Sequence, residues 1–173
     1  MRILVVVDMQ KDFIDGALGT LEAKAIVPAV RERIAQYRQA GDLVVFTRDT
    51  HPAEYLTTRE GKSLPVVHCV EGTPGWEIAP SLPVEDSPVF NKPTFGSVEL
   101  GQYVAELLQK QEIESVELVG LCTDICVISN AMVLRAFAPE LPISVNSHCC
   151  AGVTPASHEQ ALKAMAVCQV EIL

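Results

Sequence analysis

The feature that most constrains this chain is its alternation between short apolar runs and longer stretches with apolar residues at helical spacing. The first run, Ile3 to Val7, contains only Ile, Leu and Val, which is typical of a strand buried on both faces of a parallel sheet. Ile26, Val30 and Ile34 then follow at helical spacing, and Gly41 supplies a stop signal. Such alternation favours βαβ units and a parallel sheet covered by helices on both faces.

The same pattern predicts five further strands and three further helices. The strands are expected at residues 43–47, 89–91, 116–119, 143–145 and 170–173. Helices are expected around Leu100 to Leu108, from an N-cap at Asp124 to about Phe137, and after the pair Thr154-Pro155. Residues 50–88 are rich in Pro, Gly and Thr, and so long a loop is usually functional or carries small local elements. We therefore expect one α/β domain over residues 1–173, with three layers and a six-stranded, mostly parallel sheet.

Composition excludes several classes of protein. The 173 residues carry a formal charge of −9. This argues against a nucleic-acid partner, because a protein that binds nucleic acid normally needs a basic face. No apolar run approaches the roughly 20 residues that a membrane span requires. The start of the chain does not resemble a signal peptide, and the six cysteines show no Cys-x-x-Cys pair. We expect reduced thiols in a cytoplasmic protein that does not contact membranes.

Charged residues follow several of the predicted strands. Asp8, Asp49 and Lys92 each lie where a strand ends, and the segment 120–126 follows another strand. Ligands of open α/β sheets bind at the carboxyl ends of the strands, so these positions are candidates for a site. The turn after the first strand contains no glycine, which excludes a dinucleotide or phosphate loop there.

Cys126 is the candidate nucleophile. It comes two residues after Asp124, in the first turn of the expected helix, where the helix N-terminus favours a thiolate. Lys92 could place a cation beside this thiolate, and Asp8 could accept a proton. The alternative is a buried helical cysteine without chemistry, which is the commoner role for this residue type.

Two histidines and two acidic residues form a candidate metal site. Asp49 and His51 are two residues apart in an extended segment and point the same way, and His68 follows in the long loop. Glu60 is a possible fourth ligand. This set suits zinc and also accommodates manganese or iron. The alternative is a turn-forming aspartate and two ordinary loop histidines.

Five segments of the chain, in order, carry a family resemblance. They are VVVDMQKDF at residues 5–13, TRDTH at 47–51, HCVEGTPG at 68–75, NKP at 91–93 and GLCTDICV at 120–127. Together they resemble the isochorismatase-like cysteine hydrolases, the family that includes nicotinamidases. The resemblance implies a six-stranded, mostly parallel sheet and assembly into a homo-oligomer.

The resemblance also implies roles for individual residues. Asp8, Lys92 and Cys126 would form a catalytic triad. The peptide bond between Cys122 and Thr123 would be cis, and the amides of Cys122 and Cys126 would form an oxyanion hole. One divalent metal ion, with zinc as first choice, would bind the metal residues described above and orient a ring nitrogen of the substrate.

The substrate pocket is where the chain departs from the family pattern. Gln10 and Phe13 match pocket positions, but the aromatic residue expected three residues before His68 is replaced by Pro65. Whether Trp76 compensates stays open.

The implied activity is that of a metal-containing cysteine amidohydrolase acting on a small carboxamide. Nicotinamide, cleaved to nicotinate and ammonia through a thioester, is the first choice. Isochorismatase activity or another small-amide hydrolysis is the alternative within the family. A catalytically idle binding or scaffold protein is the alternative outside it, although such a protein has no need of a nucleophile at a helix N-terminus.

Overall fold

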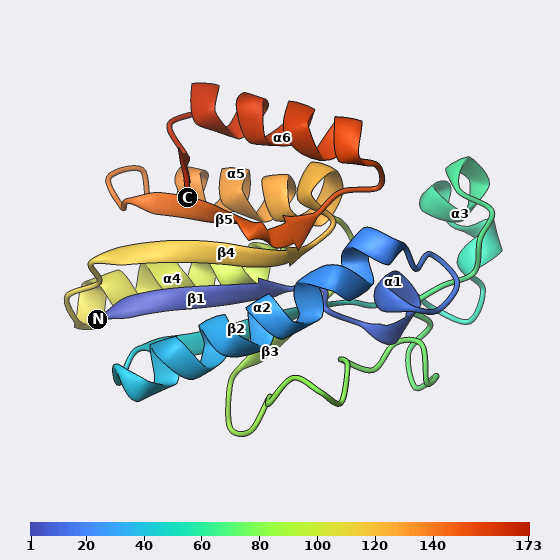
Figure 1. The fold of residues 1–173 in the computed structure, drawn as a ribbon, viewed down its shortest axis with the longest axis horizontal. Coiled ribbons are helices and arrows are strands. Elements are labelled where there is room, and N and C mark those ends of the chain that lie inside the picture. The colour runs from blue at the N-terminus through green and yellow to red at the C-terminus, as the bar shows by residue number, and fades with distance from the viewer.

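The strands form one six-stranded sheet in the order β3-β2-β1-β4-β5-β6, and every neighbouring pair is parallel (Figure 1). The computed structural model describes all of residues 1–173. The strands are β1 (Arg2–Val7), β2 (Leu43–Asp49), β3 (Val89–Lys92), β4 (Ser115–Leu121), β5 (Ile143–Ala151) and β6 (Glu171–Ile172). The helices are α1 (Lys11–Ile14), α2 (Leu21–Gln39), α3 (Arg59–Ser63), α4 (Val98–Lys110), α5 (Ile128–Phe137) and α6 (Pro155–Val167). The predicted fold class is confirmed.

The central strand β1 explains the three layers. Ile3, Val5 and Val7 pack into one apolar cluster with residues of α4, α5 and α6, whereas Leu4 and Val6 pack on the opposite face with residues of α2. All five side chains are fully buried. Because neighbouring residues of a strand point to opposite faces, this apolar run serves two cores at once.

Local signals set the ends of α2 and α6. The Thr20 side chain accepts a hydrogen bond from the Ala23 amide at the start of α2, and Gly41 just beyond its end adopts a φ of 75°. Thr154 caps α6, with Pro155 as its first residue. These are the side-chain caps and the left-handed stop residue that helix ends favour. The helix ends expected at Gly41 and Thr154 are confirmed.

The expected N-cap at Asp124 is wrong. The helical segment begins two residues earlier than such a cap implies, with a wide π-helical turn, Thr123–Val127, which leads into α5. Asp124 lies inside this turn, and its carboxylate accepts a hydrogen bond from the Val153 amide instead. The segment after β4 is therefore tied to the segment after β5.

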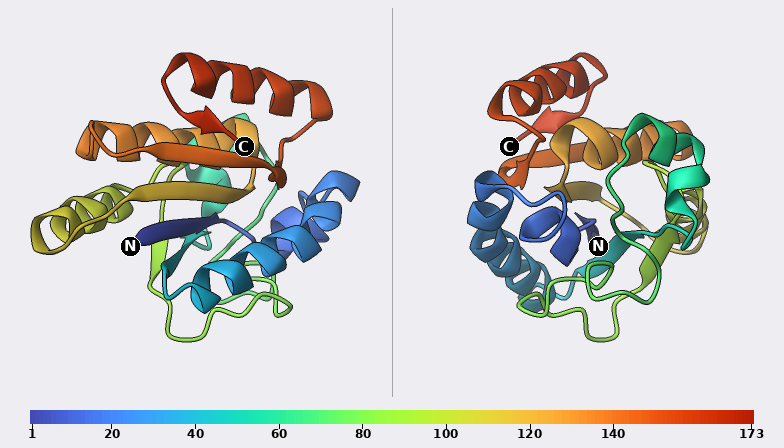
Figure 2. Two further views of the ribbon diagram at one scale, coloured as in Figure 1. Left: turned by 60° about the vertical axis from the view of Figure 1, so that its left-hand side comes forward. Right: turned by 90° about the vertical axis from the view of Figure 1, so that its right-hand side faces the viewer.

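The connection between β2 and β3 leaves the carboxyl end of β2 and returns to the start of β3, where Val89 pairs with Phe46. It contains one short turn of 3-10 helix, Tyr55–Thr57, and the five-residue helix α3. The right panel of Figure 2 looks onto the carboxyl end of the sheet and shows α3 standing at its rim. No helix in the structure is both long and apolar enough to cross a membrane. All six cysteines have free thiols.

Candidate active site

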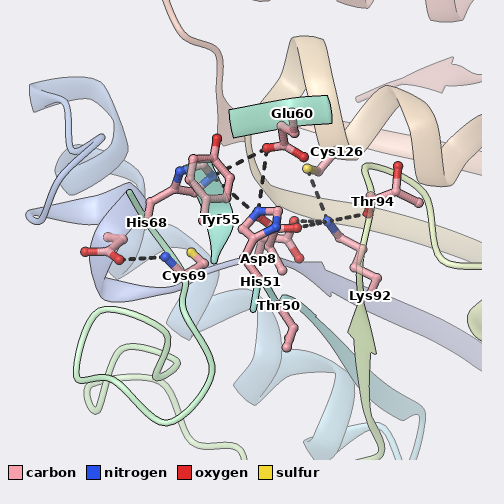
Figure 3. A network of polar contacts seen from close by, with 12 residues as sticks. Asp8, Thr50, His51, Tyr55, Glu60, His68, Cys69, Lys92, Thr94 and Cys126 are labelled. Carbon is pink, nitrogen blue, oxygen red and sulfur yellow. Dashed lines mark hydrogen bonds and ion pairs between the residues drawn. The ribbon is translucent and has the colours of Figure 1, made fainter. Parts of the chain in front are cut away.

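Asp8, Lys92 and Cys126 meet at the carboxyl end of the sheet (Figure 3). Lys92 Nζ lies 2.6 Å from Asp8 Oδ2 and 3.3 Å from Cys126 Sγ. The three residues follow or end β1, β3 and β4 respectively, which are separated in sequence but open onto the same edge. The convergence expected from strand ends is therefore present, and all three side chains are buried.

The ammonium of Lys92 is shared among several acceptors. Besides Asp8 and Cys126, it contacts Asp49 Oδ1 at 3.3 Å and the Thr94 carbonyl at 3.1 Å. Burial opposes the charge of Lys92, but Asp8, Cys126 and Asp49 outweigh it, and the pKa of Lys92 is raised. Lys92 therefore stays protonated at neutral pH.

Asp8 is suited to accept a proton. Burial raises the pKa of its carboxyl group, whereas the charge of Lys92 and a hydrogen bond from Thr47 Oγ1 at 2.7 Å oppose that rise. A carboxylate whose pKa is raised is a better general base than one in water.

The surroundings of Cys126 oppose the thiolate that a position near a helix N-terminus favours. Burial raises the pKa of the Cys126 thiol well above its usual value, and the charges of Asp8 and Asp49 raise it further, while Lys92 opposes them. A thiolate would be a third negative charge beside a single ammonium. The geometry instead favours a thiol that passes its proton to a neighbouring carboxylate.

The cis peptide bond lies one residue earlier than expected, between Leu121 and Cys122 rather than between Cys122 and Thr123. Thr123 already begins the helical turn, so the chain changes direction immediately after β4 ends at Leu121. Ile125 and Val127 donate to the carbonyl of Cys122, while the amide of Cys122 itself has no hydrogen-bond partner within the chain. This free donor lies in the segment that carries Cys126.

Gly120 is required where β4 approaches β1. It has a φ of 118°, and a Cβ atom added there would collide with the backbone of Val7. The two strands can therefore bring Asp8 and the Cys126 segment together only with glycine at this position.

Asp49, His51, Glu60 and His68 form a compact group beside the triad. Each offers one ligand atom, and the four atoms lie within 4.8 Å of one another. His51 Nε2 is 2.8 Å from Asp49 Oδ2, and His68 Nε2 is 3.6 Å from Glu60 Oε1. The Val66 carbonyl lies 2.7 Å from His68 Nδ1, so the other ring nitrogen faces the group.

The chemistry of this group fits a divalent metal ion. It supplies two imidazole nitrogens and two carboxylate oxygens, the donors that zinc, manganese and iron accept. Burial opposes the charge of Asp49, but the hydrogen bond to His51 and the charge of Lys92 outweigh it, so the pKa of Asp49 is lowered. The structure thus brings all four sequence-predicted ligands together, including Glu60 from α3.

A cavity of about 370 Å³ opens beside Cys126 and the metal group. Phe13, Glu60, His68 and Cys126 all contribute to its wall. Most of the remaining lining is apolar: Leu18, Ala23, Leu64, Phe95, Leu121, Ile125 and Val153. Phe13, which the resemblance places in the substrate pocket, lines this cavity.

Gln10, which the resemblance places in the substrate pocket, does not line this cavity. Its Nε2 donates to the carbonyls of Asp49 and Trp76, and its Oε1 accepts from the Asp49 amide at 2.7 Å. Both ends of the side chain are thus used in holding the end of β2. Trp76 does not line the cavity either, because its ring stacks under Arg48, 3.4 Å from ring centroid to guanidinium carbon.

A comparison with known protein families identifies the family to which this chain belongs. The isochorismatase domain model matches residues 2–173. This chain belongs to the isochorismatase family.

This isochorismatase-family chain is similar to several nicotinamidases and pyrazinamidases. The nicotinamidase/pyrazinamidase of Mycobacterium tuberculosis is 30% identical, and the match covers 100% of this chain and 98% of that protein. The nicotinamidase of Schizosaccharomyces pombe is 29% identical over 98% of this chain and 91% of its own. Among solved structures, the pyrazinamidase of Pyrococcus horikoshii in complex with zinc is 32% identical, with a TM-score of 0.85 and coverage of 99% and 98%.

Sequence reasoning missed part of the pocket of this family member. Leu64, Phe95 and Val153 come from three separate loops, and each is more than a third exposed. Exposed apolar residues in loops have no periodic signal. Only the folding of the loops over the strand ends identifies them as pocket residues.

Proposed function

We propose that this chain is a metal-dependent cysteine amidohydrolase of the nicotinamidase type, which converts nicotinamide to nicotinate and ammonia. One observation carries the proposal: Cys126, which belongs to a buried set with Asp8 and Lys92, lines one largely apolar cavity together with three members of the metal group, Asp49, Glu60 and His68. The names of the relatives from M. tuberculosis and S. pombe support the same substrate.

The triad residues have distinct roles in the proposed reaction. Cys126 Sγ attacks the amide carbonyl while its proton passes to Asp8, and Lys92 remains protonated beside both groups. The amides of Cys122 and Cys126 donate to the oxygen that gains negative charge, a type of interaction often worth several kcal/mol. Asp8 then protonates the amide nitrogen, the C–N bond breaks, and ammonia leaves.

The second half of the reaction regenerates the enzyme. A water molecule gives a proton to Asp8 as it attacks the carbonyl carbon of the thioester, and the C–S bond breaks. Cys126 recovers its proton from Asp8, and the acid loses its remaining proton to solvent and leaves as its carboxylate. The same carboxylate is base and acid in turn, which fits its raised pKa.

Asp49, His51, Glu60 and His68 would hold one divalent metal ion, with zinc as first choice and manganese or iron as alternatives. When bound, such an ion supplies a Lewis acid to which a ring nitrogen of the substrate can bind. Phe13 provides a ring on the cavity wall against which an aromatic substrate can pack. We further infer that residues 1–173 act as one domain, and that copies of the chain assemble into a homo-oligomer.

The experiment measures ammonia and nicotinate released from nicotinamide by protein purified without added metal or chelator. Elemental analysis of the same preparation measures bound metal. Turnover in the wild type, its loss in Cys126→Ala and about one equivalent of a transition metal would support the proposal. A metal-free wild type that leaves nicotinamide intact would overturn it.

A further inference from the structure

Two consecutive residues of the segment that carries Cys126 are tied to the segment that follows β5. Thr123 Oγ1 and His158 Nδ1 share a hydrogen bond at 2.8 Å, and the Asp124 carboxylate accepts from the Val153 amide at 3.1 Å. His158 lies in the second turn of α6, which follows β5 through a short connection (Figure 1). None of the proposed chemistry uses this histidine.

Thr123 is fully buried, and the hydrogen bond to His158 is the only one that its hydroxyl makes. A buried hydroxyl without a hydrogen-bond partner costs free energy. Loss of His158 would therefore favour a shift of Thr123 to a position where its hydroxyl finds another partner. Thr123 is the first residue of the π-helical turn and directly follows Cys122. A shift of Thr123 therefore moves the free amide of Cys122 relative to Cys126.

The position of His158 is itself fixed by close packing. A Cβ atom added to Gly152 would lie 2.9 Å from the Cβ and backbone nitrogen of His158, so α6 approaches the chain closely there. The Thr154 cap at the start of α6 fixes the helix further. Gly152 also lines the catalytic cavity, so α6 contacts the backbone of the site directly.

On its other side, the histidine borders a second cavity. This cavity, of about 350 Å³, is also lined by Glu22, His148, Gly152 and Glu159. The imidazole therefore stands between the buried catalytic turn and a space into which a small molecule can enter.

We propose that His158 is a positioning residue for the hydrolysis. Through the Thr123 hydroxyl it holds the turn in which Cys126 and the free amide of Cys122 face the same carbonyl group. The inference rests on the proposed function, because it assumes that Cys126 hydrolyses an amide. It does not depend on the identity of the ring attached to that amide. Misplacement of the turn that carries Cys126 destabilises the transition state more than it weakens substrate binding. Loss of His158 should therefore lower kcat and leave KM nearly unchanged.

The first experiment compares His158→Ala, Thr123→Val and the double variant in nicotinamide hydrolysis. Each single variant is expected to lower kcat about 10- to 100-fold with KM within about twofold. The double variant should be no slower than the slower single variant, because both changes remove one interaction. His158→Asn, whose amide lies near the place of Nδ1, and Thr123→Ser, which keeps the hydroxyl, should recover most of kcat.

His148→Ala is the matched control, since this exposed histidine lines the same second cavity but makes no side-chain hydrogen bond. It should keep wild-type kcat. Added imidazole should restore part of the activity of His158→Ala, because the enlarged cavity can receive it. Thermal unfolding of each variant identifies any that fails to fold, and His158→Asn and Thr123→Ser then carry the comparison.

A second assay separates this inference from the choice of substrate. p-Nitrophenyl acetate acylates a cysteine when sulfur attacks the acetyl carbon, the C–O bond breaks and p-nitrophenolate leaves, which gives a measurable burst. A wild type that shows the burst through Cys126 but leaves nicotinamide intact would overturn the proposed substrate alone. Wild-type burst rates in folded His158→Ala and Thr123→Val, or equal kcat values where nicotinamide is hydrolysed, would overturn the positioning role.

Discussion

Replacement of Lys92 by methionine tests whether one ammonium compensates the charges of the site. Lys92 is 1% exposed, and its Nζ lies 2.6 Å from Asp8 Oδ2 and 3.3 Å from Asp49 Oδ1. Methionine keeps the length and apolar stem of the side chain but removes the charge. Two buried carboxylates would then lose the cation that they share.

The expected cost follows from the burial of these groups. Removal of one partner from a buried ion pair costs about 3–5 kcal/mol, because it leaves an uncompensated charge. For a chain of this size each kcal/mol lowers Tm by about 2–4 °C, so Lys92→Met should lower Tm by about 6–20 °C. Nicotinamide hydrolysis should fall to background in the same variant.

The loss of stability should depend on pH. The positive charge of Lys92 opposes the rise in the pKa of Asp8 that burial causes. Without Lys92 the pKa of Asp8 in the folded state rises further above its unfolded value of about 3.9. Between these two values the folded variant binds more protons than the unfolded chain, so its stability falls as pH rises. Lys92→Met should therefore lose more stability at pH 7 than at pH 5.

Urea unfolding at both pH values, with a chelator in every sample, measures these differences without a contribution from metal. The matched double variant Asp8→Asn with Lys92→Met removes one carboxylate together with the cation, and it should be more stable than Lys92→Met alone. A Lys92→Met protein within about 1 kcal/mol of the wild type at pH 7 would refute the reasoning. So would a loss that grows as pH falls.

Four further variants test the metal group and the pocket. His51→Ala should lose the bound metal found by elemental analysis in the wild type; retention of a full equivalent would contradict the ligand assignment. Gln10→Ala should weaken metal binding about 10- to 100-fold in a competition titration, because Gln10 fixes the backbone of Asp49; unchanged affinity would contradict this. Phe95→Ala should raise KM for nicotinamide about 2- to 10-fold with kcat nearly unchanged, and a fall in kcat alone would argue against a binding role. Asp49→Asn should speed iodoacetamide labelling of Cys126 relative to His51→Ala, because Asp49 raises the pKa of that thiol; equal rates in these two metal-free variants would contradict the shared electrostatics.

The parts of the fold that the sequence predicts are those set by local pattern. The run from Ile3 to Val7 has to be buried on both faces wherever it lies, and this requirement alone predicts a central strand between two helical layers. Gly41 and Thr154 act within one turn of their own helices. The triad was predictable for a related reason, because the carboxyl ends of parallel strands meet at one edge.

What the sequence does not reveal concerns positions where tertiary contacts decide. Gln10 lies in a segment that resembles the family. No pattern in one sequence reveals that its side-chain amide forms hydrogen bonds with the backbone of Asp49. Asp124 has the residue type of a helix cap. Its carboxylate instead accepts a hydrogen bond from the Val153 amide, in the connection after β5. Full burial and the charge of Asp8 raise the pKa of the Cys126 thiol, and its position near a helix terminus does not reveal either effect.

The arrangement of Asp49 joins the two halves of the site in a way that spacing cannot reveal. Its Oδ1 lies 3.3 Å from Lys92 Nζ, and its Oδ2 lies 2.8 Å from His51 Nε2. One carboxylate therefore contacts both the ammonium of Lys92 and a histidine of the metal group. Asp-x-His spacing indicates the second contact only, because β3 brings Lys92 to Asp49 through strand pairing. The pairing of β3 with β2 is thus what lets one side chain act in both the proposed chemistry and the proposed binding of the ring.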